Sequence, residues 1–296
     1  MKICVPATSA NLGPGFDTLG IALKLKNCVD IQPSNKFRII MKGNESRHIR
    51  QKKNELFFKI YNRHQKSLSK QSNRNLQFTF YNNIPISRGL GSSSAVIVSA
   101  IASACSVAGF SSIQRSRILN SALEYEHHPD NITPAVVGGF TVAVLERNRV
   151  YYKKKNIPPY LKAVIVVPHQ NISTAKSRTT LPNIYSKEDA IFNISHSSFL
   201  TASFFNEDWD SLRIASKDRF HQVQRMKQLP ELFRVQKIAL ENGALMSTLS
   251  GSGSSFFNMV YQEDTARLVM ELQHAFPSFR ILVLDFDNDG VQVFHK

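Results

Sequence analysis

A glycine- and serine-rich stretch, NNIPISRGLGSSSAVIVSA at residues 82–100, has the composition of a loop that holds a phosphate. A glycine loop that opens a helix can bind an anion, because the first helical N–H groups lack partners and the helix dipole is positive there. Gly89 and Gly91 let the backbone approach a ligand, and the serines at 92–94 add hydroxyls suited to Mg²⁺. The stretch has no P-loop lysine, and Ser94 replaces the third glycine of a dinucleotide loop. Taken alone, it could equally be a tight turn with a serine cap.

Three further stretches gather small and polar residues in the same manner. Asn and Asp are common in turns, so turn chemistry is the alternative to a binding role for each of them. The adjacent histidines of the second stretch do not form a metal motif, because two neighbouring side chains on a helix cannot face one ion. The stretches are PATSANLGPGFDTLGIAL (6–23, with Asn11 and Asp17), EYEHHPDNITPAVVGG (124–139, with Asp130 and Asn131) and LSGSGSSFF (249–257).

The elements that position these groups mix strands and helices. The alternation in LQFTFY (76–81) predicts a half-buried strand, and a helix is expected from Ser92 to Gly109. A second helix is expected from a Ser111 or Ser112 cap through Glu126, with the following His-His-Pro ending it. The chain shows no repeats. Further expectations are a helix at 53–70, a hairpin around ERN (146–148), a Pro-rich linker at 153–162, helices near 186–205, 207–228, 231–242 and 263–275, and strands in KAVIVVP, SSFFNMVY and RILVLDF.

Length and charge bound the class of protein. A chain of 296 residues with 42% hydrophobic content is expected to form one large or two medium globular domains. The mixture of expected strands and helices indicates the α+β class with two domains. The net charge is +15, and the segment 42–74 holds ten Lys/Arg against two Glu. A solvated helix face, with Leu56, Ile60 and Tyr61 on its apolar side, explains this segment better than contact with nucleic acid.

Two other features concern the compartment. Residues 89–114 carry no charge over a length that could span a bilayer, but they are rich in serine, so a helix buried in a globular core is the better interpretation. Neither a membrane nor a nucleic-acid partner is predicted. Cys4, Cys28 and Cys105 show no close pairing, which is typical of free thiols in a reducing compartment.

The motifs together resemble one family. Read from Pro85 to Ser94, P-x-x-x-G-L-G-S-S-S is similar to the ATP loop of the GHMP kinases, and the motifs follow the family's order over residues 6–257. ATSANLGPGFDTLGIAL and HPDNITPAVVGGF resemble the members that act on homoserine. The resemblance implies cytoplasmic, Mg²⁺-dependent transfer of the γ-phosphoryl group of ATP to L-homoserine, in threonine biosynthesis. It also implies a ribosomal-S5-domain-2-like N-terminal domain (1–155) and a ferredoxin-like C-terminal domain (156–296), and it leaves a homodimer open.

The resemblance assigns roles by position. Asp17 and Asn131 are the candidate catalytic residues; some relatives have an aspartate base where Asn131 stands, so transfer without a strong base is expected. The metal ligands would be Ser92 and Glu126, with Glu124 as the alternative to Glu126. The substrate pocket would be formed by Asn11, Asp17, His128, Asp130, Asn131, Thr174 and Arg178 of ISTAKSR, and Arg225 of RFHQVQR. The ATP loop would be formed by Pro85, Ile86, Ser87, Arg88, Gly89, Leu90, Gly91, Ser92, Ser93, Ser94 and Ala95.

Two departures from the family pattern concern the local backbone. Ser254 stands where the third loop usually has proline, and a histidine pair stands where a glycine often precedes the H-P-D-N stretch. Two rival readings remain: a GHMP kinase acting on mevalonate, phosphomevalonate or a sugar, and an RNA-binding protein. The first predicts an aspartate at position 131, and the second predicts salt-dependent nucleic-acid binding without nucleotide turnover.

Overall fold

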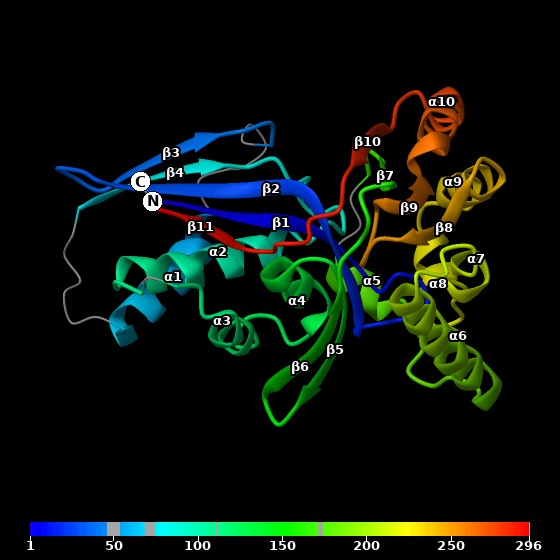
Figure 1. The fold of residues 1–296 in the computed structure, drawn as a ribbon, viewed down its shortest axis with the longest axis horizontal. Helices are drawn as coiled ribbons and strands as arrows, with labels where there is room; N and C mark the ends of the chain where they lie inside the picture. Colours follow the sequence, from blue (N-terminus) through cyan, green and yellow to red (C-terminus); the bar gives the residue numbers. More distant parts are fainter. Residues whose placement is uncertain (46–53, 69–74, 111, 171–173, 296) are drawn as a thin grey trace.

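The computed structural model describes residues 1–45, 54–68, 75–110, 112–170 and 174–295, apart from the side chains of 54 and 174–176 (Figure 1). Its elements are β1 (Lys2–Ala10), β2 (Leu19–Pro33), β3 (Arg38–Lys42), α1 (Asn54–Leu68), β4 (Leu76–Tyr81), α2 (Ser92–Val107), α3 (Arg115–Ala122), α4 (Pro129–Val137), β5 (Phe140–Glu146), β6 (Arg149–Lys155), β7 (Leu161–Val167), α5 (Thr174–Thr179), α6 (Lys187–Asn206), α7 (Leu212–Ala215), α8 (Gln222–Met226), α9 (Glu231–Glu241), β8 (Ala244–Leu249), β9 (Phe256–Tyr261), η3 (Gln262–Asp264), α10 (Thr265–Ala275), β10 (Arg280–Leu284) and β11 (Gln292–Phe294).

Two sheets organise the molecule. The first has the order β11-β1-β2-β4-β3, and β5 joins it by pairing with both β2 and β6. Helices α1 to α4 cover one face of this sheet (Figure 1). The second sheet has the order β10-β7-β9-β8, and helices α5 to α10 lie with it in the other half of the molecule. The loops after β1, before α2 and between β8 and β9 meet between the two halves.

The end of the chain returns to its beginning. β11 pairs antiparallel with β1, with Lys2 opposite Phe294. The N-terminal ammonium of Met1 donates a hydrogen bond of 2.9 Å to the carbonyl of Ile31 on the next strand. The last strand, β11, therefore belongs to the first sheet. The division of the chain into two domains at residue 155 stays a prediction.

Helix α2 lies in the middle of the N-terminal core. Most of its residues are buried, between α1, β1, α3 and α4, which explains why this stretch carries no charge. No helix among the described residues is long and apolar enough to cross a membrane. The basic helix α1 packs on α2. Its Phe57, Ile60 and Tyr61 are buried, and its Lys59 and Arg63 are exposed. Leu56, expected on the apolar face, is exposed instead; the rest of the basic segment, at 46–53 and 69–74, lies outside the described residues.

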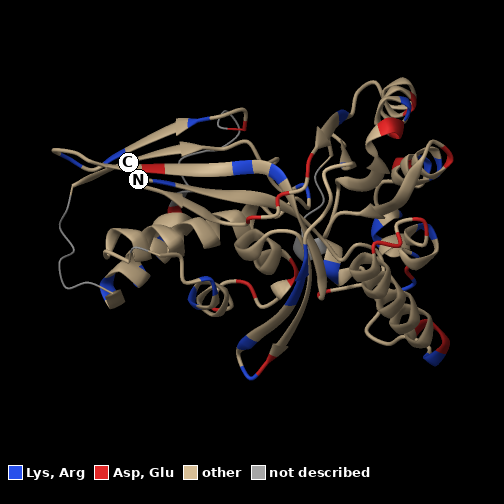
Figure 2. Ribbon diagram, in the orientation of Figure 1, with Lys and Arg blue, Asp and Glu red and all other residues tan. Residues whose placement is uncertain are grey.

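Charges are spread over both halves of the molecule, with basic residues on β2 and on the β5–β6 hairpin (Figure 2). The hairpin itself is confirmed: β5 and β6 pair from Phe140 with Lys155 to Glu146 with Arg149. Its turn residues, Arg147 and Asn148, have φ of 47° and 59°. Two successive left-handed residues match the turn type that fits the twist of the strands.

Three further sequence expectations are wrong. The second predicted helix covers only Arg115–Ala122, so Glu126 lies in a loop, and Pro129 begins α4 instead of ending a helix. Proline suits the first turn of a helix, where its missing N–H would have no partner. The helix expected at 207–228 is two short ones, α7 and α8. An Asp218 side chain that accepts backbone hydrogen bonds interrupts it.

The cysteines are the third correction. Cys4 and Cys28 lie opposite each other on β1 and β2 and form a disulfide, so two of the three expected free thiols are paired. Cys105 is free and buried in α2. The sequence separation of 24 residues hides the pairing, because it is the strand register that brings the two together.

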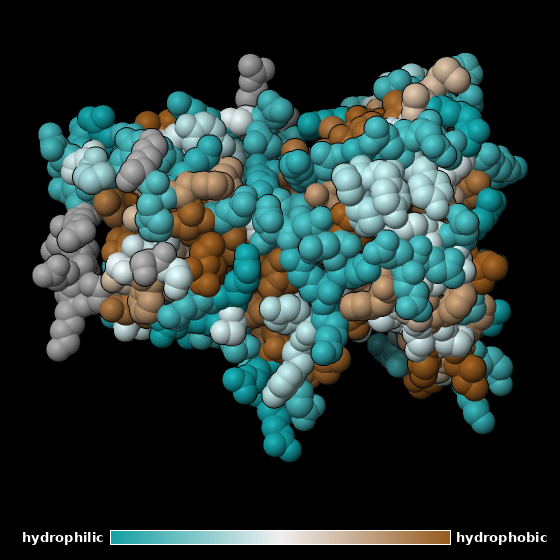
Figure 3. Space-filling view, viewed as in Figure 1, coloured by the Kyte–Doolittle hydropathy of each residue, from teal (hydrophilic) through white to brown (hydrophobic). Residues whose placement is uncertain are grey.

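An apolar surface lies on α6. Ile191 and Ile194 are 57% and 66% exposed, and hydrophobic side chains gather in this part of the molecule (Figures 1 and 3). Association of two copies stays a prediction.

Candidate active site

A cleft of about 470 Å³ opens where the three loops meet. Most of the residues predicted for the ATP loop, the substrate pocket and the metal line it. Pro85 and Ala95 are buried behind it, and the side chain of Thr174 lies outside the described residues. The lining residues that sequence reasoning did not assign are Asn27, Leu56, Asn82, Ile84, Val96, Gly251 and Ser252.

The loop before α2 has the geometry of an anion site. Gly89 and Gly91 have φ of 75° and 65°, and Gly91 caps α2 without any side-chain hydrogen bond to the free N–H groups. No acidic residue occupies the first turn. The helix therefore presents unpartnered N–H groups to the cleft, where a phosphate is favoured. Asn27 fixes the approach to this loop, because its Oδ1 accepts from the N–H of Asn83 at 2.8 Å and of Ile84 at 3.0 Å.

The small-residue loop between β8 and β9 holds the glycine loop before α2 in place. The hydroxyl of Ser250 donates to the carbonyl of Gly89 at 2.7 Å, and the N–H of Ser255 donates to the carbonyl of Arg88 at 3.0 Å. The Arg88 guanidinium reaches the carbonyl of His169. A Cβ on Gly89 would lie 2.1 Å from the carbonyl oxygen of Ser250, so the two loops touch at the backbone. Ser254, the departure from proline, donates its hydroxyl to the carbonyl of Gln170.

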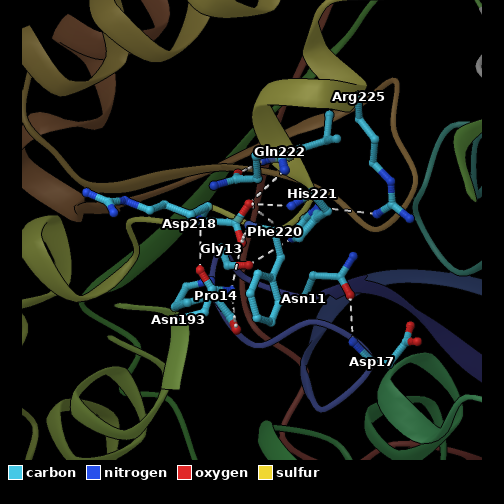
Figure 4. A network of polar contacts seen from close by, with 12 residues as sticks. Asn11, Gly13, Pro14, Asp17, Asn193, Asp218, Phe220, His221, Gln222 and Arg225 are labelled. Carbon is cyan, nitrogen blue, oxygen red and sulfur yellow. Dashed lines mark hydrogen bonds and ion pairs between the residues drawn. The ribbon is translucent and has the colours of Figure 1, made fainter. Parts of the chain in front are cut away.

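Asp17 is the centre of a charged cluster at the other end of the cleft. Arg178 contacts both of its oxygens, at 2.7 Å and 3.2 Å, and the Nδ1 of His128 lies 3.2 Å from Oδ2. Burial outweighs the Asp17 charge and lowers the pKa of His128, so at neutral pH this contact is a hydrogen bond from a neutral ring. The N–H of Asp17 donates to Oδ1 of Asn11, which shapes the loop that carries both (Figure 4).

Arg225 is a second guanidinium beside the first. It is 2% exposed, and its carbon Cζ lies 5.2 Å from the centre of the Phe16 ring; Cζ of Arg178 lies 5.5 Å from the same centre. Burial, and then the charge of Arg178, lowers the pKa of Arg225 to about 10, which leaves it charged at neutral pH. Its Nη2 makes no hydrogen bond with the described part of the chain, so a carboxylate in the cleft would meet an unpaired donor.

Two further carboxyl groups, those of Asp130 and Glu126, line the same cleft. Burial, and then the charges of Asp17 and Glu126, raises the pKa of Asp130 to about 7. Burial also raises the pKa of Glu126, whose Oε2 accepts a hydrogen bond of 2.9 Å from Ser94. Such raised values are common where a site is built to receive a cation or a proton.

These donors fit Mg²⁺. Carboxylate and hydroxyl oxygens are the ligands that it prefers, usually one or two from the protein and the rest from phosphates and water. Glu126 and Ser94 lie at the mouth of the phosphate loop, and no group of three His, Cys, Asp or Glu converges among the described residues. Ser92 lines the same cleft. Its role as a metal ligand stays a prediction. Glu124 points elsewhere and pairs with Arg63 at 2.7 Å.

Asn131 touches the phosphate loop through Thr8. The Thr8 hydroxyl, fully buried, donates to Oδ1 of Asn131 at 2.7 Å. A Cβ on Gly91 would lie 1.9 Å from this hydroxyl and 3.3 Å from that oxygen. The carboxamide NH₂ of Asn131 is therefore the end left for the cleft. An amide in this position can donate a hydrogen bond but cannot act as a base.

The comparisons with known proteins agree on one family. The N-terminal domain of the GHMP kinases matches residues 55–139, and their C-terminal domain matches residues 200–277. The homoserine kinase of Sulfurovum sp. is 57% identical over 98% of this chain and 99% of its own. That of Aliarcobacter butzleri is 58% identical over 99% of each chain.

The chain belongs to the GHMP kinase family, among the homoserine kinases. Its place in this family makes it an enzyme that uses ATP and a small-molecule acceptor. The crystal structure of homoserine kinase from Cytophaga hutchinsonii, at 25% identity, superposes with a TM-score of 0.86 over 99% of this chain and 97% of that one. A mevalonate kinase structure at 15% identity, with a TM-score of 0.73, shares the fold alone. The expected family and two-domain α+β fold are confirmed.

Proposed function

We propose that this kinase transfers the γ-phosphoryl group of ATP to the hydroxyl of L-homoserine and releases O-phospho-L-homoserine and ADP. The proposal is supported by the identity to homoserine kinases over the whole chain and by one observation on the site. The anion loop before α2 and the guanidinium pair line one cleft of about 470 Å³. This volume is large enough to hold the triphosphate of a nucleotide in contact with a small amino acid. The reaction would serve threonine biosynthesis.

The phosphate end is assigned to the loop from Pro85 to Ala95. Its free N–H groups and the α2 dipole stabilise the negative charge that the γ-phosphoryl group carries in transfer. Mg²⁺, when bound, would neutralise phosphate charge, with Glu126 and a hydroxyl of the loop as its protein ligands. Ser94 already touches Glu126, and Ser92 is the alternative hydroxyl.

The acceptor end is assigned to the charged cluster. Homoserine has a carboxylate, an ammonium and a terminal hydroxyl. Arg225, with Arg178 beside it, offers positive charge and a guanidinium N–H donor that a carboxylate can accept from. The carboxyl groups of Asp17 and Asp130 offer acceptors for the ammonium, with Asn11, His128 and Thr174 forming the rest of the pocket.

The chemistry is expected to need positioning more than a base. Asp17 is the candidate base, but Arg178 already contacts both of its carboxylate oxygens and His128 contacts one of them. Asn131 can donate to the γ-phosphoryl oxygens and cannot take a proton. Phosphoryl transfer tolerates this, because alignment and charge neutralisation supply most of the rate enhancement.

The test is an ADP-release assay with Mg-ATP and a panel of alcohols: L-homoserine, L-serine, mevalonate and galactose. Turnover selective for homoserine supports the proposal. Turnover with mevalonate or galactose instead would keep the family and overturn the assignment of the guanidinium pair. We also place the reaction in the cytoplasm, and in that reducing compartment the register of β1 and β2 would keep Cys4 and Cys28 adjacent as thiols.

A further inference from the structure

A buried hydrogen-bond network leads from α6 to the guanidinium of Arg225 (Figure 4). It begins at Asp218, whose side chain is fully buried. One oxygen accepts from Nδ2 of Asn193 on α6 and from the N–H of Phe220, each at 3.0 Å. The other accepts from the N–H of His221 at 2.9 Å and of Gln222 at 2.7 Å. These four bonds fix the backbone that carries His221.

The ring of His221 is held at both nitrogens. Nε2 lies 2.8 Å from the carbonyl of Gly13, and a carbonyl can only accept, so Nε2 carries the proton. Nδ1 is then an acceptor, and it lies 3.2 Å from Nη1 of Arg225. The ring is fully buried, and burial lowers the pKa of His221 although the charge of Asp218 opposes it. The neutral tautomer with a free Nδ1 is therefore the one that the site selects.

The same guanidinium nitrogen has a second partner. Nη1 of Arg225 donates to the carbonyl of Gly251 at 3.1 Å, and Nδ2 of Asn11 donates to that carbonyl at 3.0 Å. Nε of Arg225 lies 3.5 Å from the carbonyl of Ser177. Because the protein occupies Nη1 and Nε, Nη2 is the guanidinium nitrogen that remains to bind a ligand in the cleft.

We propose that His221 is a positioning residue for the acceptor: its unprotonated Nδ1 fixes the guanidinium of Arg225 so that Nη2 meets the carboxylate of the substrate. This rests on the function proposed above and deepens it. His221 does not touch the cleft, since only Arg225 of this pair lines it. It acts through the arginine, and so it determines how strongly the site prefers an acceptor with a negative charge.

Two conservative variants separate this role from a merely structural one. In His221→Gln, the longer amide can donate to Gly13 as Nε2 does, but it places no acceptor at the Nδ1 position that faces Arg225. In His221→Asn, the amide oxygen lies near the Nδ1 position, so the acceptor is kept and the Gly13 contact is lost. Both side chains are polar and smaller than or similar to imidazole, so both should fold. Gln222→Met is the matched control. It removes a buried hydrogen bond of 2.7 Å, in which Oε1 of Gln222 accepts from the N–H of Leu249, and this bond does not involve Arg225.

The measurements are kcat and KM for L-homoserine, KM for ATP, and the same constants for L-homoserine amide, whose neutral carboxamide replaces the carboxylate. If the amide is not turned over, its inhibition constant against homoserine takes their place. We expect His221→Gln to raise KM for homoserine about tenfold or more, the effect of losing one hydrogen bond to a charged group. KM for ATP and the constants for the amide should stay within about twofold. His221→Asn should remain close to the wild type, and Gln222→Met should lower the melting temperature without changing the preference for homoserine over its amide.

Equal effects of His221→Gln and His221→Asn would overturn the inference, as would an unchanged KM for homoserine or a parallel loss with the amide. Failure of the proposed function has a different signature. A wild-type enzyme without homoserine turnover overturns that function, and a wild type that does not prefer homoserine over its amide overturns the carboxylate role of Arg225 and, with it, the role of His221.

Discussion

The contact between the two glycine loops can be tested by adding one methyl group. Gly89 has φ of +75°, and a Cβ there would meet the carbonyl oxygen of Ser250 at 2.1 Å and the N–H nitrogen of Gly253 at 3.0 Å. Both are backbone atoms, so neither can rotate away. The substitution Gly89→Ala must therefore separate the loop that faces the phosphates from the loop that supports it.

The magnitude follows from three terms. A left-handed conformation costs an alanine about 1–2 kcal/mol. Loss of the hydrogen bond from Ser250 to the Gly89 carbonyl adds about 1 kcal/mol, and the displacement of the backbone adds to both. Gly109 is the matched control, because its φ is +94° and a Cβ there would meet nothing within 4 Å. Gly109→Ala should therefore show the first term alone.

Thermal unfolding and ATP kinetics measure the difference. At about 2 °C per kcal/mol for a chain of this length, Gly109→Ala should lower the melting temperature by about 2–4 °C, and Gly89→Ala by at least about 4–6 °C. Only Gly89→Ala should raise KM for ATP, by about tenfold or more. Equal melting temperatures and an unchanged KM for ATP in both variants would refute the contact between the loops.

Three further predictions concern the site and the sheet. Thr8→Val keeps the shape of the side chain and removes the hydrogen bond to Asn131, so kcat should fall about five- to tenfold at unchanged KM, with Thr8→Ser near the wild type; a kcat equal to that of the wild type would exclude this role. The pKa of Asp130 is raised to about 7, so this group stabilises the fold below about pH 4 and loses that contribution as pH rises to 7. Asp130→Asn should thus be more stable than the wild type at pH 8, and the gap in melting temperature should shrink at pH 4.5; a gap independent of pH would contradict the burial argument. Finally, protein that is air-oxidised and then unfolded should show one alkylated cysteine, Cys105, and reduction should expose two more; three reactive thiols after oxidation would rule out the disulfide between β1 and β2.

Local patterns in the sequence were enough for several elements. The charge-free run after Gly91 predicts a buried helix, and α2 begins at Ser92 as expected. The ERN turn predicts the β5–β6 hairpin, because strand twist favours two left-handed residues there. The glycine loop predicts an anion site from elementary helix chemistry. The residues from 85 to 95 all line the cleft or lie just behind it.

Contacts between distant parts of the chain could not be predicted in this way. His221 and Gly13 are 208 residues apart, and nothing in RFHQVQR distinguishes a ring that positions an arginine from one that lines the pocket. Thr8 lies in the middle of a strand and shows no signal of its partner Asn131. Pro129 reads equally well as the end of one helix and the start of the next. The difference depends on where the following residues are buried.

The central claim is that the cleft transfers phosphate from ATP to the homoserine hydroxyl. The most direct test is ³¹P NMR of the enzyme with Mg-ATP and L-homoserine. The account predicts that the γ-phosphate signal of ATP declines as a phosphomonoester signal, split by the neighbouring CH₂ protons, and the signals of ADP grow in equal amounts. Release of inorganic phosphate in place of that ester, or no loss of the γ-phosphate signal, would contradict it.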